Sequence, residues 1–352
     1  MKMYLFDLGH LPGHQSMLVF HTLARMGIEA LVLVSPESPL GSVGYFQDTQ
    51  KEVDLEFCRR AKIPLMRREI GGGATYLDQN QIFYQVIWRK DNTRLPQRIK
   101  DVFSILSEPA CQTYRVFGID AHFRLENDIV TEEGRKIAGE GGGNIGNSMV
   151  FVGGILMNFD YSTMTRMLKV PDEKLRDKIF RTMEENVTTM RRELGTVPPR
   201  SEIISVLVDR FSRVLGRLTP GNLDRATLQK MRELERWLAS DRFLFRKTPK
   251  IPRGVKIREG IEILYGLYKA KGGLIRTVET VEGSRLNEVE ISGDFQFCPK
   301  EDLSRLENSL MQTTFERETI QGRIEAFYEK EEVETPGVSP EDLAEAVVTA
   351  KP

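Results

Sequence analysis

Three consecutive glycines, Gly71, Gly72 and Gly73, follow the arginine pair Arg67 and Arg68. Glycine lacks a Cβ, so its backbone can take positive φ and approach a ligand closely. Successive N–H groups in such a turn can form an anion-binding concavity, and the arginines add forked donors for phosphate or carboxylate. A flexible hairpin turn is the alternative interpretation. The stretch has neither the Walker lysine nor the G-x-G-x-x-G spacing, so it predicts anion binding without specifying a reaction.

Lys136 is the second candidate for chemistry. It lies between Arg135 and Ile137 in a segment expected to be a strand, so its side chain points to the face opposite both neighbours. A lysine in this position can simply belong to the polar face of an edge strand. The glycines that follow, Gly139 and residues 141–143, favour a position facing a ligand.

Composition narrows the possible classes of protein. The chain has 352 residues, 40% of them hydrophobic and 29% charged, which is typical of a globular protein with room for two domains. Lys and Arg number 50 against 51 Asp and Glu, so the balanced charge gives no argument for nucleic acid as a partner. With no signal peptide and no apolar run of about 18 residues, we expect a cytoplasmic protein without a membrane partner.

The three cysteines, Cys58, Cys111 and Cys298, are far apart in the sequence. They form no C-x-x-C pair, so neither a disulfide framework nor a zinc site is indicated.

The elements that must position these residues alternate between short strands and helices. This alternation predicts an α/β (α+β) fold in which helices pack on mixed β-sheets. A hairpin is expected at residues 129–138. Strands are expected at residues 3–8, 30–34, 114–120 and 149–159, and helices at residues 14–26, 51–61, 171–194, 201–215 and 228–240.

Domain limits follow from a basic, proline-punctuated stretch at residues 247–254, which is typical of a linker. The pattern predicts a large catalytic domain at residues 1–246. Alternating strands at residues 274–281 and 286–291, followed by a helix after Pro299, predict a small α+β domain at residues 255–330. Residues 331–352 are expected to be a polar tail with one weak helix.

Several segments resemble the lipoate–protein ligases, within the biotin/lipoate ligase and octanoyltransferase superfamily. Residues 67–78, RREIGGGATYLD, resemble the ligase pattern R-R-x-[ST]-G-G-G-A-x-x-H-D. Residues 127–129 and 134–139 resemble its N-D-[IL] and G-R-K-[IV]-[SA]-G motifs. GGLIR at residues 272–276 and ISGDF at residues 291–295 resemble the accessory domain of ligases.

The resemblance implies roles for individual residues. Lys136 would be the catalytic lysine, bridging the lipoate carboxylate and the α-phosphate of ATP. Asp128 would lie at a Mg²⁺ ion, and the glycine loop after Lys136 would close over the adenylate. The implied ATP and lipoyl-AMP site consists of Arg68, Gly71, Gly72, Gly73, Ala74, Thr75, Tyr76, Asp78, Asn127, Asp128 and Gly139.

The implied reaction has two steps. Lipoate or octanoate is activated with ATP to acyl-AMP, and the acyl group then passes to a lysine of a lipoyl-domain or lipoate-binding carrier protein. Three departures from the pattern indicate a divergent branch: Ile70 replaces Ser or Thr, Leu77 replaces His, and FVG at residues 151–153 replaces H-H-G. One such branch serves lipoate-binding proteins of sulfur oxidation.

Three alternatives remain open. A cysteine-dependent octanoyl or lipoyl transferase of the same superfamily needs a thiolate shortly after the lysine motif, where this chain has NSMV at residues 147–150. A biotin ligase would carry a G-R-G-R loop, which the sequence lacks. A non-catalytic lipoyl- or nucleotide-binding module would not depend on Lys136.

Overall fold

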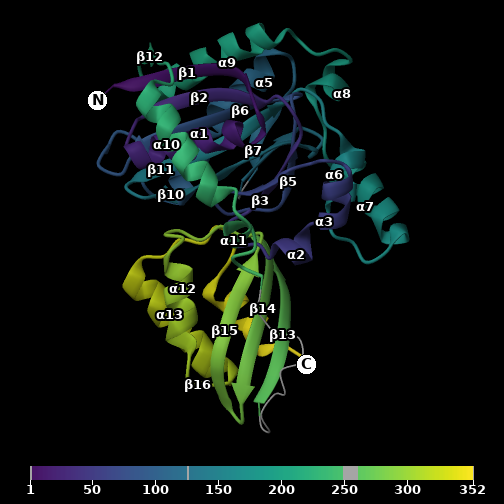
Figure 1. Ribbon diagram of the computed structural model, residues 1–352, viewed down its shortest axis with the longest axis vertical. Coiled ribbons are helices and arrows are strands. Elements are labelled where there is room, and N and C mark those ends of the chain that lie inside the picture. Colours follow the sequence, from purple (N-terminus) through teal and green to yellow (C-terminus); the bar gives the residue numbers. More distant parts are fainter. Residues whose placement is uncertain (1, 125–126, 249–260, 352) are drawn as a thin grey trace.

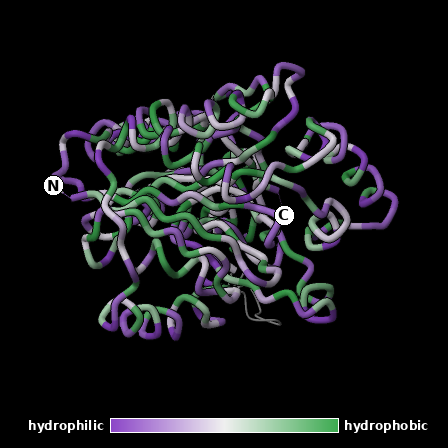
Figure 2. Tube along the Cα trace, turned by 90° about the horizontal axis from the view of Figure 1, so that it is seen from above, coloured by the Kyte–Doolittle hydropathy of each residue, from purple (hydrophilic) through white to green (hydrophobic). Residues whose placement is uncertain are grey.

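The computed structural model describes residues 2–124, 127–248 and 261–351. It has a larger N-terminal lobe and a smaller C-terminal lobe, stacked along the longest axis of the molecule (Figure 1). Seen from above, hydrophobic strands run through the interior, and hydrophilic residues are concentrated on the surrounding helices (Figure 2). The mixed α/β architecture predicted from the sequence is confirmed.

The N-terminal lobe is built on a six-stranded mixed sheet in the order β10-β11-β6-β2-β1-β12. Its central strand β2 is buried at every position, because helices cover both faces of the sheet. α1 (Gly13–Met26) and α10 (Arg225–Leu238) pack on one face, and α4 (Ile99–Leu106), α5 (Glu108–Val116) and α9 (Arg200–Leu215) on the other. The strands are β1 (Met3–Leu11), β2 (Ala30–Pro36), β6 (Gln81–Arg89), β10 (Gly141–Ile145), β11 (Ser148–Leu156) and β12 (Leu218–Pro220).

Two three-stranded sheets carry the sequence motifs. The first, in the order β4-β3-β5, contains β3 (Leu40–Val43), β4 (Leu65–Arg67) and β5 (Thr75–Leu77), so the glycine turn of residues 71–73 connects β4 to β5. The second, in the order β7-β8-β9, contains β7 (Ala121–Arg124), β8 (Asp128–Thr131) and β9 (Lys136–Gly139). The hairpin predicted around Lys136 is therefore confirmed as β8 and β9.

The C-terminal lobe is a four-stranded antiparallel sheet with three helices on one face (Figure 1). Its strands are β13 (Ile261–Ala270), β14 (Gly273–Glu282), β15 (Arg285–Gly293) and β16 (Thr313–Thr314). The helices are α12 (Asp302–Leu310), α13 (Arg317–Glu331) and α14 (Pro340–Val348).

The helix expected in the polar tail at residues 331–352 is confirmed as α14, but part of it is buried. Ser339 and Asp342 form a capping box at its start, and Leu343 and Val347 are buried in the core of the C-terminal lobe. Beyond the helix, Lys351 exchanges backbone hydrogen bonds with Tyr265 on β13. Residues 331–351 therefore belong to this lobe. The limits 1–246 and 255–330 stay predictions, and residues 249–260 of the expected linker lie outside the described residues.

Two predicted helices are each divided in two. Residues 51–61 fall in α2 (Thr49–Glu52) and α3 (Leu55–Arg60), with Asp54 capping α3 through its carboxylate. Residues 171–194 contain α7 (Glu173–Asn186) and α8 (Met190–Leu194). The break is at Val187, whose extended backbone forms a bridge to Lys136. The lobe also contains α6 (Tyr161–Met167) and α11 (Asp241–Leu244).

The predicted strand at residues 114–120 is wrong. The structure continues α5 to Val116, and the strand begins at Ala121. A short apolar run cannot by itself distinguish a strand from a buried helix. Cys111 and Tyr114 lie on the buried face of α5, and Gly118, at φ +89°, turns the chain toward β7.

The glycines at residues 141–143 form part of β10 and not a loop. A Cβ on Gly142 would lie 3.0 Å from Ile99 Cδ1, so the glycine lets α4 pack directly on the sheet. The loop predicted to close over an adenylate is therefore not at these residues.

Candidate functional site

The hairpin of β8 and β9 holds Lys136 beside Asp128. Lys136 Nζ lies 2.6 Å from Asp128 Oδ1, and the lysine side chain is 38% exposed. A Cβ on Gly139 would lie 3.0 Å from Nζ, so the glycine leaves room for the ammonium. Three of the predicted site residues are thus brought together, with a partly exposed cation at their centre.

Backbone contacts fix the lysine motif in place. Asn127 Nδ2 donates to the Glu140 carbonyl at 3.0 Å, and the Glu140 N–H donates to the Asn127 carbonyl at 2.8 Å. The Tyr114 hydroxyl donates to the Ile137 carbonyl at 3.1 Å. Asn127 therefore acts on the Lys136 strand through the backbone of Glu140, a residue that our sequence analysis did not single out.

Arg68 holds the glycine turn in shape. Its Nη2 donates to the carbonyls of Gly71 and Gly73 at 2.8 and 2.9 Å, and its Nη1 donates to Ser42 Oγ at 3.0 Å. Gly72 has φ +91°, which a side chain would strain. Burial lowers the pKa of the Arg68 guanidinium to about 10, so it keeps its charge at neutral pH. Phosphate binding by Arg68 stays a prediction.

Arg67 is not an anion donor, contrary to the interpretation of the arginine pair. Its side chain is fully buried and donates to the carbonyls of Gly44, Tyr45 and Leu244, among others. Burial lowers the pKa of its guanidinium to about 9. Arg67 therefore joins the loop after β3 to α11, and its donors are used within the protein.

Residues 74–78 lead away from the turn along β5. Tyr76 is buried and packs edge-on against Phe159, with ring centroids 6.5 Å apart. Asp78 is also buried, which raises the pKa of its carboxyl, and it accepts hydrogen bonds from the backbone and side chain of Asn80. Of the predicted residues in this stretch, Thr75 is the one with an exposed side chain.

The glycine turn and the strand that carries Lys136 pack against shared neighbouring residues. Ile70, at the start of the glycine turn, lies beside the strand that follows Lys136, since a Cβ on Gly141 would be 3.1 Å from Ile70 Cδ1. On the other side, Phe159 packs against Tyr161, whose hydroxyl donates to the carbonyl of Val187, the residue bridged to Lys136. The glycine turn and the lysine strand are therefore connected through shared neighbours.

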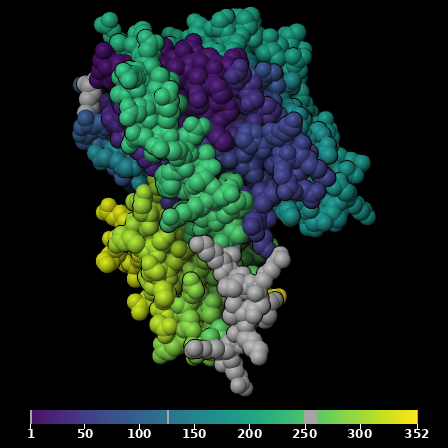
Figure 3. Space-filling view, viewed as in Figure 1, coloured from purple at the N-terminus to yellow at the C-terminus, as the bar shows by residue number. Residues whose placement is uncertain are grey.

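The C-terminal lobe lies directly against the N-terminal lobe (Figure 3). The glycine turn takes part in this contact. The Gly72 N–H donates to the Phe295 carbonyl at 3.1 Å, and a Cβ on Gly71 would lie 2.4 Å from that oxygen. Phe295 also stacks on Phe46, with ring centroids 5.3 Å apart. The turn predicted to bind phosphate is thus covered on one side by residues more than 200 positions later in the chain, as the numbering shows.

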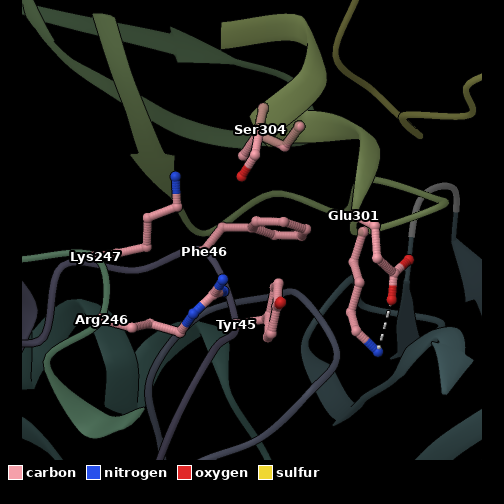
Figure 4. A pocket seen from close by; sticks show the side chains of 8 residues that line it. Tyr45, Phe46, Arg246, Lys247, Glu301 and Ser304 are labelled. Atoms are coloured by element: carbon pink, nitrogen blue, oxygen red, sulfur yellow. Dashed lines mark ion pairs between the residues drawn. The ribbon is translucent and has the colours of Figure 1, made fainter. Parts of the chain in front are cut away.

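A cavity of about 230 Å³ lies between the lobes near this contact (Figure 4). Two of its basic side chains pair with carboxylates, Lys247 with Glu307 at 2.8 Å and Lys300 with Glu301 at 3.5 Å. The Arg246 guanidinium lies over the Tyr45 ring, 4.0 Å from its centroid. The cavity is lined by Tyr45, Phe46, Arg246, Lys247, Lys300, Glu301, Leu303 and Ser304. None of these residues belongs to the predicted site, so we interpret the cavity as part of the contact between the lobes.

The described residues contain no group of three or more His, Cys, Asp or Glu side chains that could hold a metal ion. Nor does this part of the chain contain a helix long and apolar enough to cross a membrane. The Mg²⁺ role of Asp128 stays a prediction.

The cysteines are poorly suited to nucleophilic attack. Cys58 and Cys111 are buried, and desolvation raises the pKa of their thiols to about 11 and about 12. Desolvation also raises the pKa of Cys298 to about 11. A reactive cysteine needs the opposite shift, toward the thiolate.

Comparisons with known proteins identify relatives of this chain. Residues 15–212 match the family described as the lipoyl protein ligase A/B catalytic domain. The chain is 26% identical over 233 residues to octanoyltransferase LipM of Kyrpidia tusciae, covering 60% of this chain and 85% of that protein. It is 31% identical over 183 residues to lipoate-protein ligase A subunit 1 of Thermoplasma acidophilum, covering 49% of this chain and 67% of that protein.

Among solved structures, the fold is similar to that of a bi-partite lipoate protein ligase from Thermoplasma acidophilum, studied with its E2 lipoyl domain. The TM-score is 0.63 at 25% identity, over 72% of this chain and 99% of that one. The family match, which spans more than half of the sequence, and this shared fold show that the chain belongs to the lipoyl protein ligase A/B catalytic domain family.

Proposed function

We propose that this protein is an ATP-dependent lipoate–protein ligase, which activates lipoate or octanoate as acyl-AMP and transfers the acyl group to a carrier protein. The observation that carries the proposal is the partly exposed Lys136 ammonium beside Asp128, on a strand whose continuation packs against Ile70 at the start of the glycine turn shaped by Arg68. A fixed cation of this kind stabilises the negative charge that builds up when a carboxylate attacks a phosphate.

In the first step, a carboxylate oxygen of lipoate attacks the α-phosphorus of ATP, and pyrophosphate leaves. Lys136 would contact the carboxylate and the α-phosphate, and backbone N–H groups of residues 73–76 would hold the nucleotide. Asp128 would offer one carboxylate ligand to Mg²⁺, which would take its other ligands from nucleotide phosphates and water and neutralise part of the phosphate charge. In the second step, the ε-amine of the acceptor lysine attacks the acyl carbonyl, and AMP leaves.

The acceptor is proposed to be a lipoyl domain or another lipoate-binding carrier protein. Support comes from the related Thermoplasma acidophilum ligase, which was studied together with an E2 lipoyl domain. Incubation of candidate carriers with ATP, Mg²⁺ and lipoate or octanoate, followed by mass spectrometry, would identify both the acceptor and the preferred acyl chain.

The second candidate is a cysteine-dependent octanoyltransferase, and the similarity to LipM favours it. That chemistry forms a thioester on a thiolate before the acyl group reaches its acceptor. Against it stand the raised thiol pKa values of Cys58, Cys111 and Cys298. Asn147 and Ser148 also stand where the transferases are expected to carry their cysteine.

Lipoate-dependent ATP–pyrophosphate exchange distinguishes the two functions. For a ligase, we expect exchange in the wild type and in a variant with all three cysteines replaced by serine, and a loss of at least about 100-fold in Lys136→Ala. Lys90→Ala, which removes a lysine away from the motif, is the control. Acyl transfer without ATP that disappears in the cysteine-free variant would establish the transferase instead.

A further inference from the structure

Glu140, one residue after the lysine motif, is a carboxylic side chain enclosed in the core of the N-terminal lobe. Only 5% of the residue is exposed. The Tyr84 hydroxyl donates to its Oε1 at 2.6 Å, and Ser107 Oγ lies within hydrogen-bond distance of its Oε2. No basic side chain pairs with its carboxyl group among the described residues.

The hydrogen bonds around Ser107 determine where the protons are. Ser107 Oγ also lies 2.6 Å from the carbonyl oxygen of Phe103, which can only accept. One hydroxyl proton cannot serve both this carbonyl and an ionised carboxylate, because both are acceptors. If Oε2 carries a proton, Glu140 can donate that proton to Ser107 Oγ, and the Ser107 hydroxyl can donate its own proton to the Phe103 carbonyl. Each of the two hydrogen bonds then has one donor and one acceptor.

From this geometry we propose that Glu140 is a positioning residue, which holds the Lys136 strand to the core through a protonated carboxyl group that donates to Ser107 and accepts from Tyr84. The proposal deepens the proposed function and rests on it for the catalytic role of Lys136. Burial supports the neutral form, since desolvation raises the pKa of Glu140 to about 8.

Gly153 leaves space for the Tyr84 hydroxyl that donates to Glu140. A Cβ on Gly153 would lie 2.3 Å from the Tyr84 hydroxyl oxygen, so any side chain at 153 would displace the donor. Gly153 lies in the segment that departs from the family's H-H-G pattern only at its first two positions. The glycine therefore has a specific role in this chain, which is to admit the Tyr84 hydroxyl.

The neutral carboxyl also matters for the charge at the site. Asp128 and Lys136 lie close enough to Glu140 to influence its ionisation. An ionised Glu140 would add a second carboxylate near the Lys136 ammonium and compete with the substrate for it. A protonated Glu140 anchors the strand through its carboxyl contacts with Tyr84 and Ser107 while leaving Asp128 as the carboxylate paired with the lysine.

Glutamine tests the proposal because its amide oxygen can accept from Tyr84 and its amide nitrogen can donate to Ser107 without carrying a charge. We expect Glu140→Gln to retain kcat for lipoate-dependent exchange within about twofold, whereas Glu140→Ala lowers kcat by about 10- to 100-fold, as misplaced catalytic groups do. KM for ATP should change less than kcat, because the glycine turn is held in shape by Arg68 and not by the Glu140 carboxyl group. A Glu140→Gln variant that is as impaired as Glu140→Ala, or that does not fold, contradicts the proposal.

Infrared spectroscopy provides a readout that does not depend on activity. A protonated carboxyl gives a C=O band distinct from that of a carboxylate, and at neutral pH the wild type should show one that Glu140→Gln lacks. The measurement is best made in a Glu279→Gln background, since Glu279 is another buried carboxyl. Absence of the band refutes the proposal. Absence of lipoate-dependent exchange in the wild type, with the band present, would instead refute the proposed function.

Discussion

We expect the buried Glu279 to make the stability of the C-terminal lobe depend on pH. It lies on β14 with no exposed surface, between its cross-strand neighbours Leu264 and Val289. Neither of its carboxyl oxygens has a hydrogen-bond partner among the described residues. The Thr277 hydroxyl donates instead to the Ala346 carbonyl at 3.1 Å. Desolvation accordingly raises the pKa of Glu279 from 4.5 to about 8.

The sign of the effect follows from proton binding. Between pH 4.5 and pH 8 the folded lobe keeps a proton that the unfolded chain releases, so the free energy of unfolding falls as pH rises. One pH unit corresponds to about 1.4 kcal/mol per proton, so the loss between pH 4.5 and pH 7 amounts to roughly 3 kcal/mol. The contribution stops changing above the folded-state pKa. Glu279→Leu should remove this slope.

Hydrogen exchange can measure the pH dependence of stability in the C-terminal lobe itself. Trp88 and Trp237 both lie in the N-terminal lobe, so tryptophan fluorescence does not report on β14. We expect protection factors of β14 and β15 peptides, corrected for intrinsic exchange, to fall with pH in the wild type and to stay flat in Glu279→Leu. Glu282→Leu, at the exposed end of the same strand, should keep the wild-type slope. A flat wild-type profile, or an unchanged slope in Glu279→Leu, would refute the reasoning.

Two further predictions concern the N-terminal lobe, where tryptophan fluorescence can follow urea unfolding. Arg67→Met leaves several buried carbonyls without donors and should lower the free energy of unfolding by at least about 3 kcal/mol, whereas Arg59→Met, at an exposed position of α3, should leave it nearly unchanged. His21 is fully buried and accepts from the Glu69 N–H, and desolvation lowers its pKa from 6.5 to about 4. The unfolded chain therefore binds the extra proton, so stability should fall by roughly 3 kcal/mol as pH drops from 6.5 to 4, and His21→Gln should abolish that loss. An acid-side slope that survives in His21→Gln would contradict this assignment.

Much of the fold could be predicted because the strongest signals are local. β2 begins with the uninterrupted apolar run of residues 30–34, and α1 has helical spacing and ends before Gly27, which adopts the left-handed conformation. The strand predicted at residues 114–120 failed because its apolar residues belong to the end of a buried helix. The glycines at residues 141–143 were mistaken for a loop because glycine has poor strand propensity, and only packing against α4 shows why it is needed there.

The candidate site was predictable to a similar extent. The hairpin motif correctly placed Lys136 with Asp128 and Gly139. The sequence could not distinguish the environments of Arg67 and Arg68, which are neighbouring residues of the same type. Arg67 donates hydrogen bonds to carbonyls of α11, and this helix comes about 175 residues later in the chain. Glu140 had one available signal, a lone carboxylate among glycines, but Tyr84 and Ser107 are distant in sequence.

Because Gly71 has no Cβ, its contact with the C-terminal lobe restricts which residues can stand at position 71. Because the Phe295 carbonyl occupies the space where a Cβ would be, even alanine at 71 would act as a wedge between the two lobes. The atom in the way is a backbone oxygen, which is present whatever residue stands at position 295. A single substitution in the C-terminal lobe therefore could not remove the clash. A larger residue at 71 would therefore require the backbone around Phe295 to move away from the glycine turn.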